Sequence, residues 1–162
     1  MVLSRVRFGR TVLTGCAALL LAAAPSAAVA EPGVHLAIAS VYSNPATVAA
    51  GGTTTVLATV ANEGEDTTTQ PFTVTVALPP GVIAVGPFFP GNCSQDSATL
   101  VLTCTFTPPP GLPFGRTATV SIPVQIPSAQ EAGLMTGGRV SVASPEDPDP
   151  AMHGKEFSIA VV

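Results

Sequence analysis

Apolar and polar side chains alternate along most of this 162-residue chain with a period of two residues. In PFTVTVALP, residues 71–79, Phe72, Val74 and Val76 share one face, and threonines occupy the other. Such alternation predicts half-buried β-strands, and no segment shows the 3.6-residue period of a helix. Six further segments follow the same pattern: 34–42, 53–62, 98–106, 117–127, 139–144 and 155–162.

Clusters of Gly, Pro, Asn and Asp separate these segments at intervals of roughly 8–15 residues, a spacing typical of an all-β sandwich. We therefore expect an immunoglobulin-like β-sandwich of seven to eight strands without helices. Pro123 interrupts one run, and because it lacks a backbone N–H, it predicts a sheet edge or a bulge there. The residues expected to face the core include Leu100, Leu102, Cys104, Phe106, Val120, Ile122, Val124, Val140, Val142, Phe157, Ile159 and Val161.

The first thirty residues have the three parts of a secretory signal peptide. A basic start, MVLSRVRFGR, precedes the apolar run TVLTGCAALLLAAA and the small residues PSAAVA. We expect cleavage between Ala30 and Glu31, which leaves one domain at 31–162 and a secreted or cell-surface protein. The apolar run is shorter than the ~20 residues of a membrane span. Cys16 lies in a lipobox-like LTGC, but too few residues separate it from Arg10 to form a signal core of roughly 7–15 residues.

Without the leader, three basic residues remain against all ten acidic ones, so the expected mature charge is −7. This balance argues against nucleic acid as a partner, because phosphates require a basic face. It equally disfavours docking on anionic lipid.

Two cysteines, Cys93 and Cys104, remain in the mature chain, an even number for an oxidising compartment. We expect a local disulfide that ties the loop PGNCSQ to the strand carrying Cys104; the alternative is a pair of free thiols. Antibody-type domains instead link distant cysteines beside a tryptophan, and this chain contains no Trp.

Three short motifs follow one another in a recognisable order: Asn-Glu-Gly at 62–64, Leu-Pro-Pro-Gly at 78–81 and Asp-Pro-Asp-Pro at 147–150. Together they resemble the bacterial DUF11-type, or conserved repeat, surface domain over roughly residues 47–162. The resemblance implies an immunoglobulin-like fold at a bacterial cell surface. Two departures stand out: Ala-Met-His at 151–153 replaces a pair of asparagines, and the domain occurs as a single copy rather than in tandem.

The loop SPEDPDPAMHG, residues 144–154, carries the densest group of carboxylates. Glu146, Asp147 and Asp149 are candidate calcium ligands, and the acids of residues 63–66 would add to them if both loops lay at one end of the sandwich. The alternative is a solvated turn stiffened by proline. A copper site would use His35, His153, Met135 and Met152, but their spacing fits no ligand pattern.

Two long loops carry aromatic residues. Phe88 and Phe89 lie in the loop 86–92, and Phe114 lies in the loop 107–116. Each is either a contact for a partner or an apolar plug at the open end of the sandwich.

No catalytic motif is present, so we expect a non-enzymatic exported bacterial domain that mediates binding or structural assembly at the cell surface. Its partner would be a protein or a cell-wall component. The alternative is a secreted small-molecule carrier with an apolar cleft between the sheets, although aromatic residues are few. The run 157–162, FSIAVV, would support self-association if it lay at a sheet edge. We expect no cofactor other than calcium at the acidic loop.

Overall fold

The computed structural model describes residues 32–42, 44–149 and 153–162. The predicted leader at 1–30, the cleavage site at Ala30 and Glu31, and Cys16 lie outside these residues, as does Met152.

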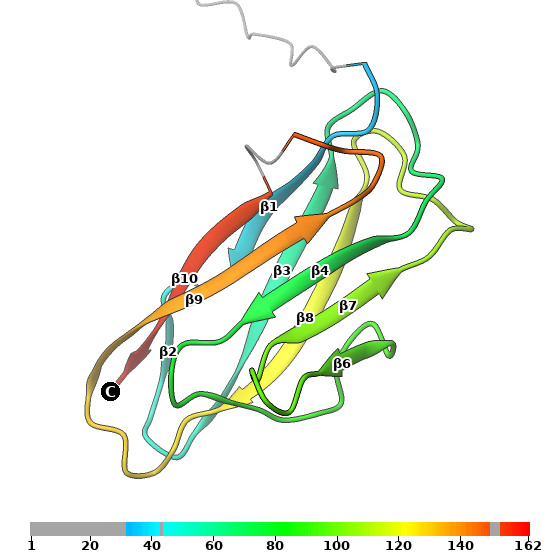
Figure 1. Cartoon of the computed structure of the whole chain (residues 1–162). Coiled ribbons are helices and arrows are strands. Elements are labelled where there is room, and N and C mark those ends of the chain that lie inside the picture. Colours follow the sequence, from blue (N-terminus) through cyan, green and yellow to red (C-terminus); the bar gives the residue numbers. More distant parts are fainter. Residues whose placement is uncertain (1–31, 43, 150–152) are drawn as a thin grey trace, which may run out of the picture.

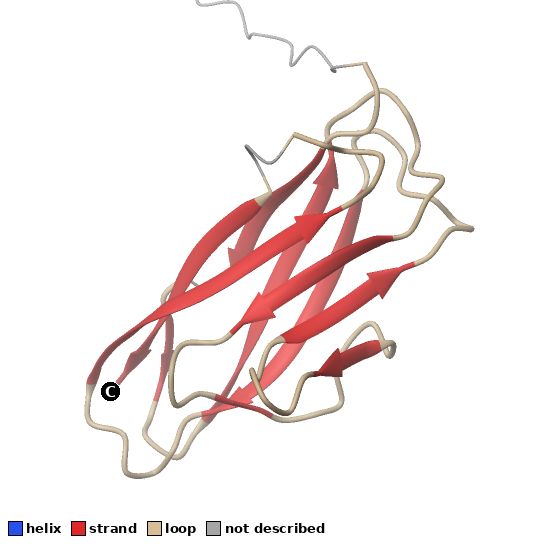
Figure 2. Cartoon of the chain, in the orientation of Figure 1, coloured by secondary structure: helices blue, strands red, loops and turns tan. Residues whose placement is uncertain are grey.

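The described residues form two β-sheets packed face to face and no helix (Figures 1 and 2). One sheet has the order β1-β3-β8-β5, and the other has the order β2-β10-β9-β4-β7-β6. The predicted fold class, an immunoglobulin-like β-sandwich, is confirmed; three short strands, β2, β5 and β6, add to the longer ones. The strands are β1 (Leu36–Tyr42), β2 (Ala46–Val48), β3 (Thr53–Asn62), β4 (Phe72–Ala77), β5 (Ile83–Ala84), β6 (Cys93–Gln95), β7 (Leu102–Phe106), β8 (Thr117–Gln125), β9 (Gly133–Ala143) and β10 (Gly154–Val161).

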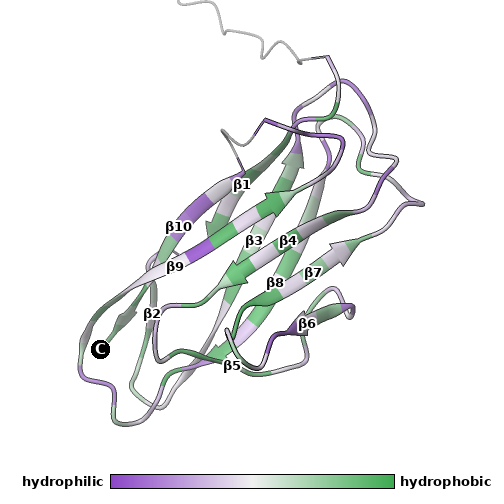
Figure 3. Ribbon diagram, in the orientation of Figure 1, coloured by the Kyte–Doolittle hydropathy of each residue, from purple (hydrophilic) through white to green (hydrophobic). Residues whose placement is uncertain are grey.

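Hydrophobic and more polar residues alternate along the strands (Figure 3), and the hydrophobic ones fill the core between the sheets, as the period-two pattern predicts. Their branched, apolar side chains interdigitate between the sheets and supply the main driving force for folding. Leu100 is the exception, because it is 56% exposed and has a φ of 60°. Asp96 Oδ1 accepts hydrogen bonds from Ala98 N and Thr99 N, so a tight turn occupies this segment and β7 begins two residues later.

The C-terminal run 157–162 does not meet the condition for self-association over Ile159–Val161, because these residues do not lie at a sheet edge. β10 pairs with β9 on one side and, over Ile159–Val161, with β2 on the other. Asn44 extends this cover, because its Nδ2 donates to Glu156 O and its Oδ1 accepts from Ser158 N. Strand addition is therefore blocked at Ile159–Val161.

Pro123 lies in β8, a strand that has a neighbour on both sides along only part of its length. β8 pairs with β3 throughout, and β5 covers only Val124 and Gln125 on the other side. Val85 N donates to Pro123 O from that second side, so the missing N–H of Pro123 faces away from β3 and removes no bond of the β3–β8 ladder.

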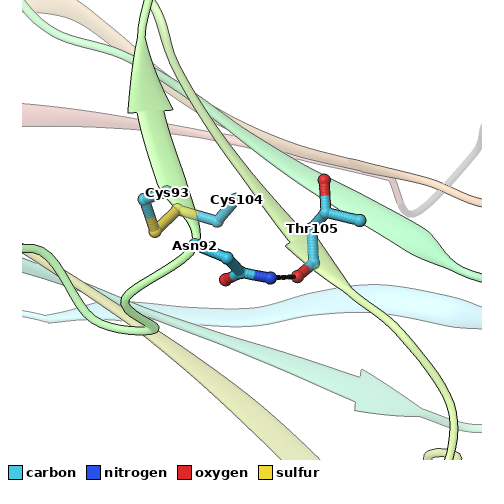
Figure 4. The surroundings of a disulfide bond; sticks show 4 residues. All are labelled: Asn92, Cys93, Cys104 and Thr105. Atoms are coloured by element: carbon cyan, nitrogen blue, oxygen red, sulfur yellow. Dashed lines mark hydrogen bonds between the residues drawn. A yellow bond between two sulfur atoms is a disulfide. The ribbon is translucent and has the colours of Figure 1, made fainter.

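The predicted disulfide joins Cys93 of β6 to Cys104 of β7, which lie directly opposite each other in the strand pair (Figure 4). The neighbouring Asn92 Nδ2 donates to Thr105 O and continues the pairing by one residue. The bridge holds the short edge strand β6 on the larger sheet, as the cysteine spacing predicts.

Candidate functional site at the loop end

Four segments meet at the end of the sandwich where β3, β7 and β9 end and β1, β4, β8 and β10 begin (Figure 1). We call this the loop end; it comprises residues 32–35, 63–71, 107–116 and 144–153, of which 150–152 are not described. Buried polar side chains join these segments.

Asn62, the last residue of β3 and the first of the Asn-Glu-Gly motif, is fully buried and makes four hydrogen bonds. Its Oδ1 accepts from His35 N at 3.3 Å and from Gly64 N at 3.1 Å. Its Nδ2 donates to Asp66 O and Leu112 O, each at 2.7 Å. One side chain thus satisfies backbone groups of three segments, because an amide carries both donors and acceptors.

The surroundings of Gly64 explain why the same motif has a glycine at this position. A Cβ at this position would lie 2.2 Å from Gly33 O and 2.6 Å from His35 N. Only glycine allows the N-terminal segment to approach this closely.

Thr68 holds the loop between β7 and β8 from a second direction. Its side chain is 1% exposed, and its Oγ1 accepts from Leu112 N at 2.8 Å, while Thr68 N donates to Leu112 O. Leu112 is therefore held at both its N–H and its C=O by buried groups. Thr68 had no signal in the sequence, since it is one of three consecutive threonines in a polar loop.

Asp147 is buried, with 3% of its surface exposed, and is neither a solvated turn residue nor an open ligand. Its Oδ2 accepts from Leu36 N at 2.5 Å and lies 2.9 Å from His153 Nε2. Its Oδ1 accepts from Asp149 N at 3.3 Å and lies 3.9 Å from His35 Nδ1. The carboxylate thus anchors the loop 144–153 to the start of β1.

Glu146 anchors the same loop to the segment before β4. Its carboxylate accepts from Thr69 Oγ1 at 2.5 Å, Thr69 N at 2.9 Å and Gln70 N at 3.0 Å. The hydrogen bond from the Thr69 hydroxyl is the main cause that holds the pKa of the Glu146 carboxyl below its usual range. Burial opposes this effect, and the bonds from Gln70 N and Thr69 N lower the pKa further.

The acidic loops do lie at one end of the sandwich, as the calcium hypothesis requires. Within the described ranges, however, no group of three His, Cys, Asp or Glu residues is placed to hold a metal ion. Glu146 and Asp147 instead direct their oxygens at protein donors.

A hollow of about 410 Å³ opens beside the loop 107–116, which is within the roughly 300–1,000 Å³ of ligand pockets. Phe72 and Phe106 form one wall as a stacked pair with ring centroids 4.8 Å apart. Its apolar lining consists of Phe72, Phe106, Pro108, Pro110, Leu112, Pro113 and Ala118. The described residues that line it include one charged residue, Arg116.

The three candidate aromatic residues differ in exposure. Phe88 is half-buried and packs against the core, whereas Phe89 is 61% exposed and Phe114 is 50% exposed. Phe88 therefore packs against the core, whereas Phe89 and Phe114 present much of their side chains to solvent.

Phe89 ends a row of residues that crosses the outer face of the four-stranded sheet. Tyr42 of β1 lies opposite Leu57 of β3, Leu57 lies opposite Ser121 of β8, and Ser121 bridges to Phe89. Tyr42 is also well exposed. The outward-facing residues of the two central strands carry no charge: Thr53, Thr55, Leu57, Thr59, Ala61, Thr117, Thr119, Ser121, Pro123 and Gln125.

No family model and no curated protein matches the chain. Solved structures do match in fold. The third cohesin of ScaC from Acetivibrio cellulolyticus, solved in complex with the ScaB dockerin, is 12% identical with a TM-score of 0.54. The match covers 73% of this chain and 94% of the cohesin. The CARDB domain of the PF1109 protein from Pyrococcus furiosus, solved in complex with di-metal ions, is 14% identical with a TM-score of 0.50, over 83% of this chain and 93% of that domain. These similarities show the fold alone.

Among the residues that the structure describes, none forms a helix of the length and apolar character needed to cross a membrane.

Proposed function

We propose that this protein is exported and non-enzymatic, and that it mediates binding or structural assembly at a bacterial cell surface. The leader at 1–30 would direct export, and the domain at 31–162 would carry the binding surface. The motifs at 62–64, 78–81 and 147–150 support placing it with the DUF11-type domains.

The uncharged outer face of the sheet β1-β3-β8-β5 carries this proposal. An exported domain with a mature charge of −7 keeps charge away from this face and exposes Tyr42 and Phe89 on it. Depletion of charge and enrichment of aromatic side chains are the features that distinguish the centre of a protein interface from ordinary surface. Cohesin ScaC, which shares the fold, was solved in a complex with another protein, and this agrees with a protein partner.

Co-sedimentation with isolated cell walls tests the proposal. The protein would be purified after export from a host that expresses the full chain, and then mixed with walls of the organism that encodes it. We expect saturable pelleting that a calcium chelator does not change. Loss of pelleting after protease treatment of the walls would identify a protein partner, whereas retention would identify a wall polymer. If the protein stays in the supernatant under all conditions, the proposal is wrong.

The hollow supports a second candidate function, a carrier for a small apolar molecule. Its volume and apolar lining are suitable for such a ligand. Saturable binding of dodecanoate to the purified protein would favour this function, and absence of binding would exclude that class of ligand.

A further inference from the structure

The edge of β8 is unpaired over its first three residues, Thr117–Thr119. Ser121 exchanges backbone hydrogen bonds of 2.8 and 3.0 Å with Phe89, so its N–H and C=O point away from β3. Backbone direction alternates along a strand, and the N–H and C=O groups of Thr117 and Thr119 therefore point the same way. Among the described residues, no strand or side chain bonds to them on that side. β8 thus offers four backbone groups to a further strand.

The hollow adjoins this open edge, since Thr117 and Ala118 line both. Ala118 lies on the same face of β8 as Val120 and Ile122, which point into the core. A strand added along the edge would direct alternate side chains to this inner side, toward the wall formed by Phe106.

Arg116 supplies a positive charge at the hollow. The mature chain has three cations; Arg139 lies 3.9 Å from Glu156, and Lys155 Nζ donates to Ala39 O at 2.9 Å. Arg116 is exposed and has no ion-pair partner among the described residues. An arginine among the residues that line an apolar hollow favours a ligand with a carboxylate.

The wall of the hollow at Gly111 and Leu112 is held by contacts within the protein that need no ligand. Asn62 and Thr68 hold the backbone of Leu112 at both its N–H and its C=O. A Cβ at Gly111 would lie 2.1 Å from Thr68 O, so the loop fits closely against this support. A preorganised site loses less conformational entropy on binding than a mobile one.

We propose that the β8 edge and the hollow form a docking site for an extended peptide segment that carries an apolar side chain next to a carboxylate. The segment pairs with Thr117–Thr119 as an added strand, inserts its apolar side chain against Phe106, and places its carboxylate beside Arg116. A lipid-like carboxylate would use the hollow and Arg116 but would leave the four backbone groups unpaired. This inference rests on the proposed binding function and names the chemistry and the site of the partner.

Selection from a phage-displayed library of random dodecapeptides, on the exported protein, tests the inference. The key variant is Thr119→Pro, which removes the N–H that points away from β3 and leaves the β3–β8 hydrogen bonds intact. Pro123, four residues further along β8 and with the same backbone direction, shows that the strand accepts a proline at such a position. Thr119→Val keeps the N–H and is its matched control. Arg116→Gln removes the guanidinium, and Arg139→Gln is the control for loss of a positive charge elsewhere. Thermal melting of each variant verifies folding.

We expect enriched peptides in which apolar and acidic residues are neighbours. Their affinity should fall about tenfold in both Thr119→Pro and Arg116→Gln, and should be unchanged in the two controls. Three results overturn the inference. The selection enriches no peptide, the selected peptides bind Thr119→Pro as tightly as wild type, or the protein binds dodecanoate but none of the library peptides. Pelleting with cell walls that persists in any of these cases leaves the proposed function standing and shows that only the docking site is wrong.

Discussion

Replacing Asn62 with alanine removes the side chain that joins three segments of the loop end. The substitution leaves the backbone N–H groups of His35 and Gly64 and the carbonyl of Asp66 without this partner, and it removes one of the two donors to Leu112 O. Because Asn62 is fully buried, water does not replace these bonds without opening the structure.

The expected loss follows from the number of bonds. At about 1 kcal/mol for each of the four, the free energy of unfolding falls by about 4 kcal/mol. Domains of this size have total stabilities of about 5–15 kcal/mol, so Asn62→Ala is close to the limit of folding. With an unfolding entropy of about 2.1 cal/mol/K per residue over about 130 residues, the melting temperature drops by about 15 °C.

Urea unfolding followed by circular dichroism measures this loss, and Asn92→Ala is the matched control. Asn92 is an exposed asparagine whose side chain makes one described hydrogen bond, to Thr105 O. The control should therefore lose no more than about 1 kcal/mol. If Asn62→Ala is destabilised by the same amount as Asn92→Ala, the clamping role of Asn62 is refuted.

The remaining predictions concern the acidic loop and the disulfide. Asp147→Ala should lower the free energy of unfolding by about 3 kcal/mol, because it leaves a buried backbone N–H unsatisfied. Glu131→Ala, in an exposed loop, is the control and should have little effect. Urea unfolding compares the two variants, and an equal loss of unfolding free energy in both would contradict the prediction. The Glu146 carboxyl has a pKa below its ordinary value of 4.5, so its stabilisation is complete above that value and is lost as pH falls through the lower folded pKa. The stability difference between wild type and Glu146→Gln, measured from pH 7 to 2, should shrink accordingly; a constant difference would show that ionisation plays no part. Replacing both Cys93 and Cys104 with alanine should cost about 3 kcal/mol, since the bridge closes a short loop; a cost below about 1 kcal/mol would contradict a stabilising bridge.

Strand faces and the fold class could be predicted because a half-buried strand repeats every two residues. The one inward residue placed wrongly, Leu100, fits the period but follows Asp96, whose side chain closes a turn. The period does not reveal this local competition between side chain and backbone.

The partners of the loop residues could not be predicted, because they are distant in sequence. Asp147 bonds to a backbone N–H 111 residues away, and Thr68 to one 44 residues away. The motifs containing Asn62 and Asp147 marked these positions, but only the packing of the two sheets shows that they hold loops together. Phe88 and Phe89 differ in exposure because Phe89 pairs with Ser121 as a strand residue would, so neighbouring side chains point to opposite faces.

The most direct test of the central claim, that the uncharged sheet face binds a partner, is a wall-binding isotherm for Phe89→Ser. Leu134→Ser is the control, because Leu134 is equally apolar and 58% exposed but belongs to the other sheet. We predict that Phe89→Ser raises the dissociation constant about tenfold, as expected for an aromatic contact residue, while Leu134→Ser leaves it unchanged. Equal affinity of wild type and Phe89→Ser, or no saturable binding of either, would contradict the account.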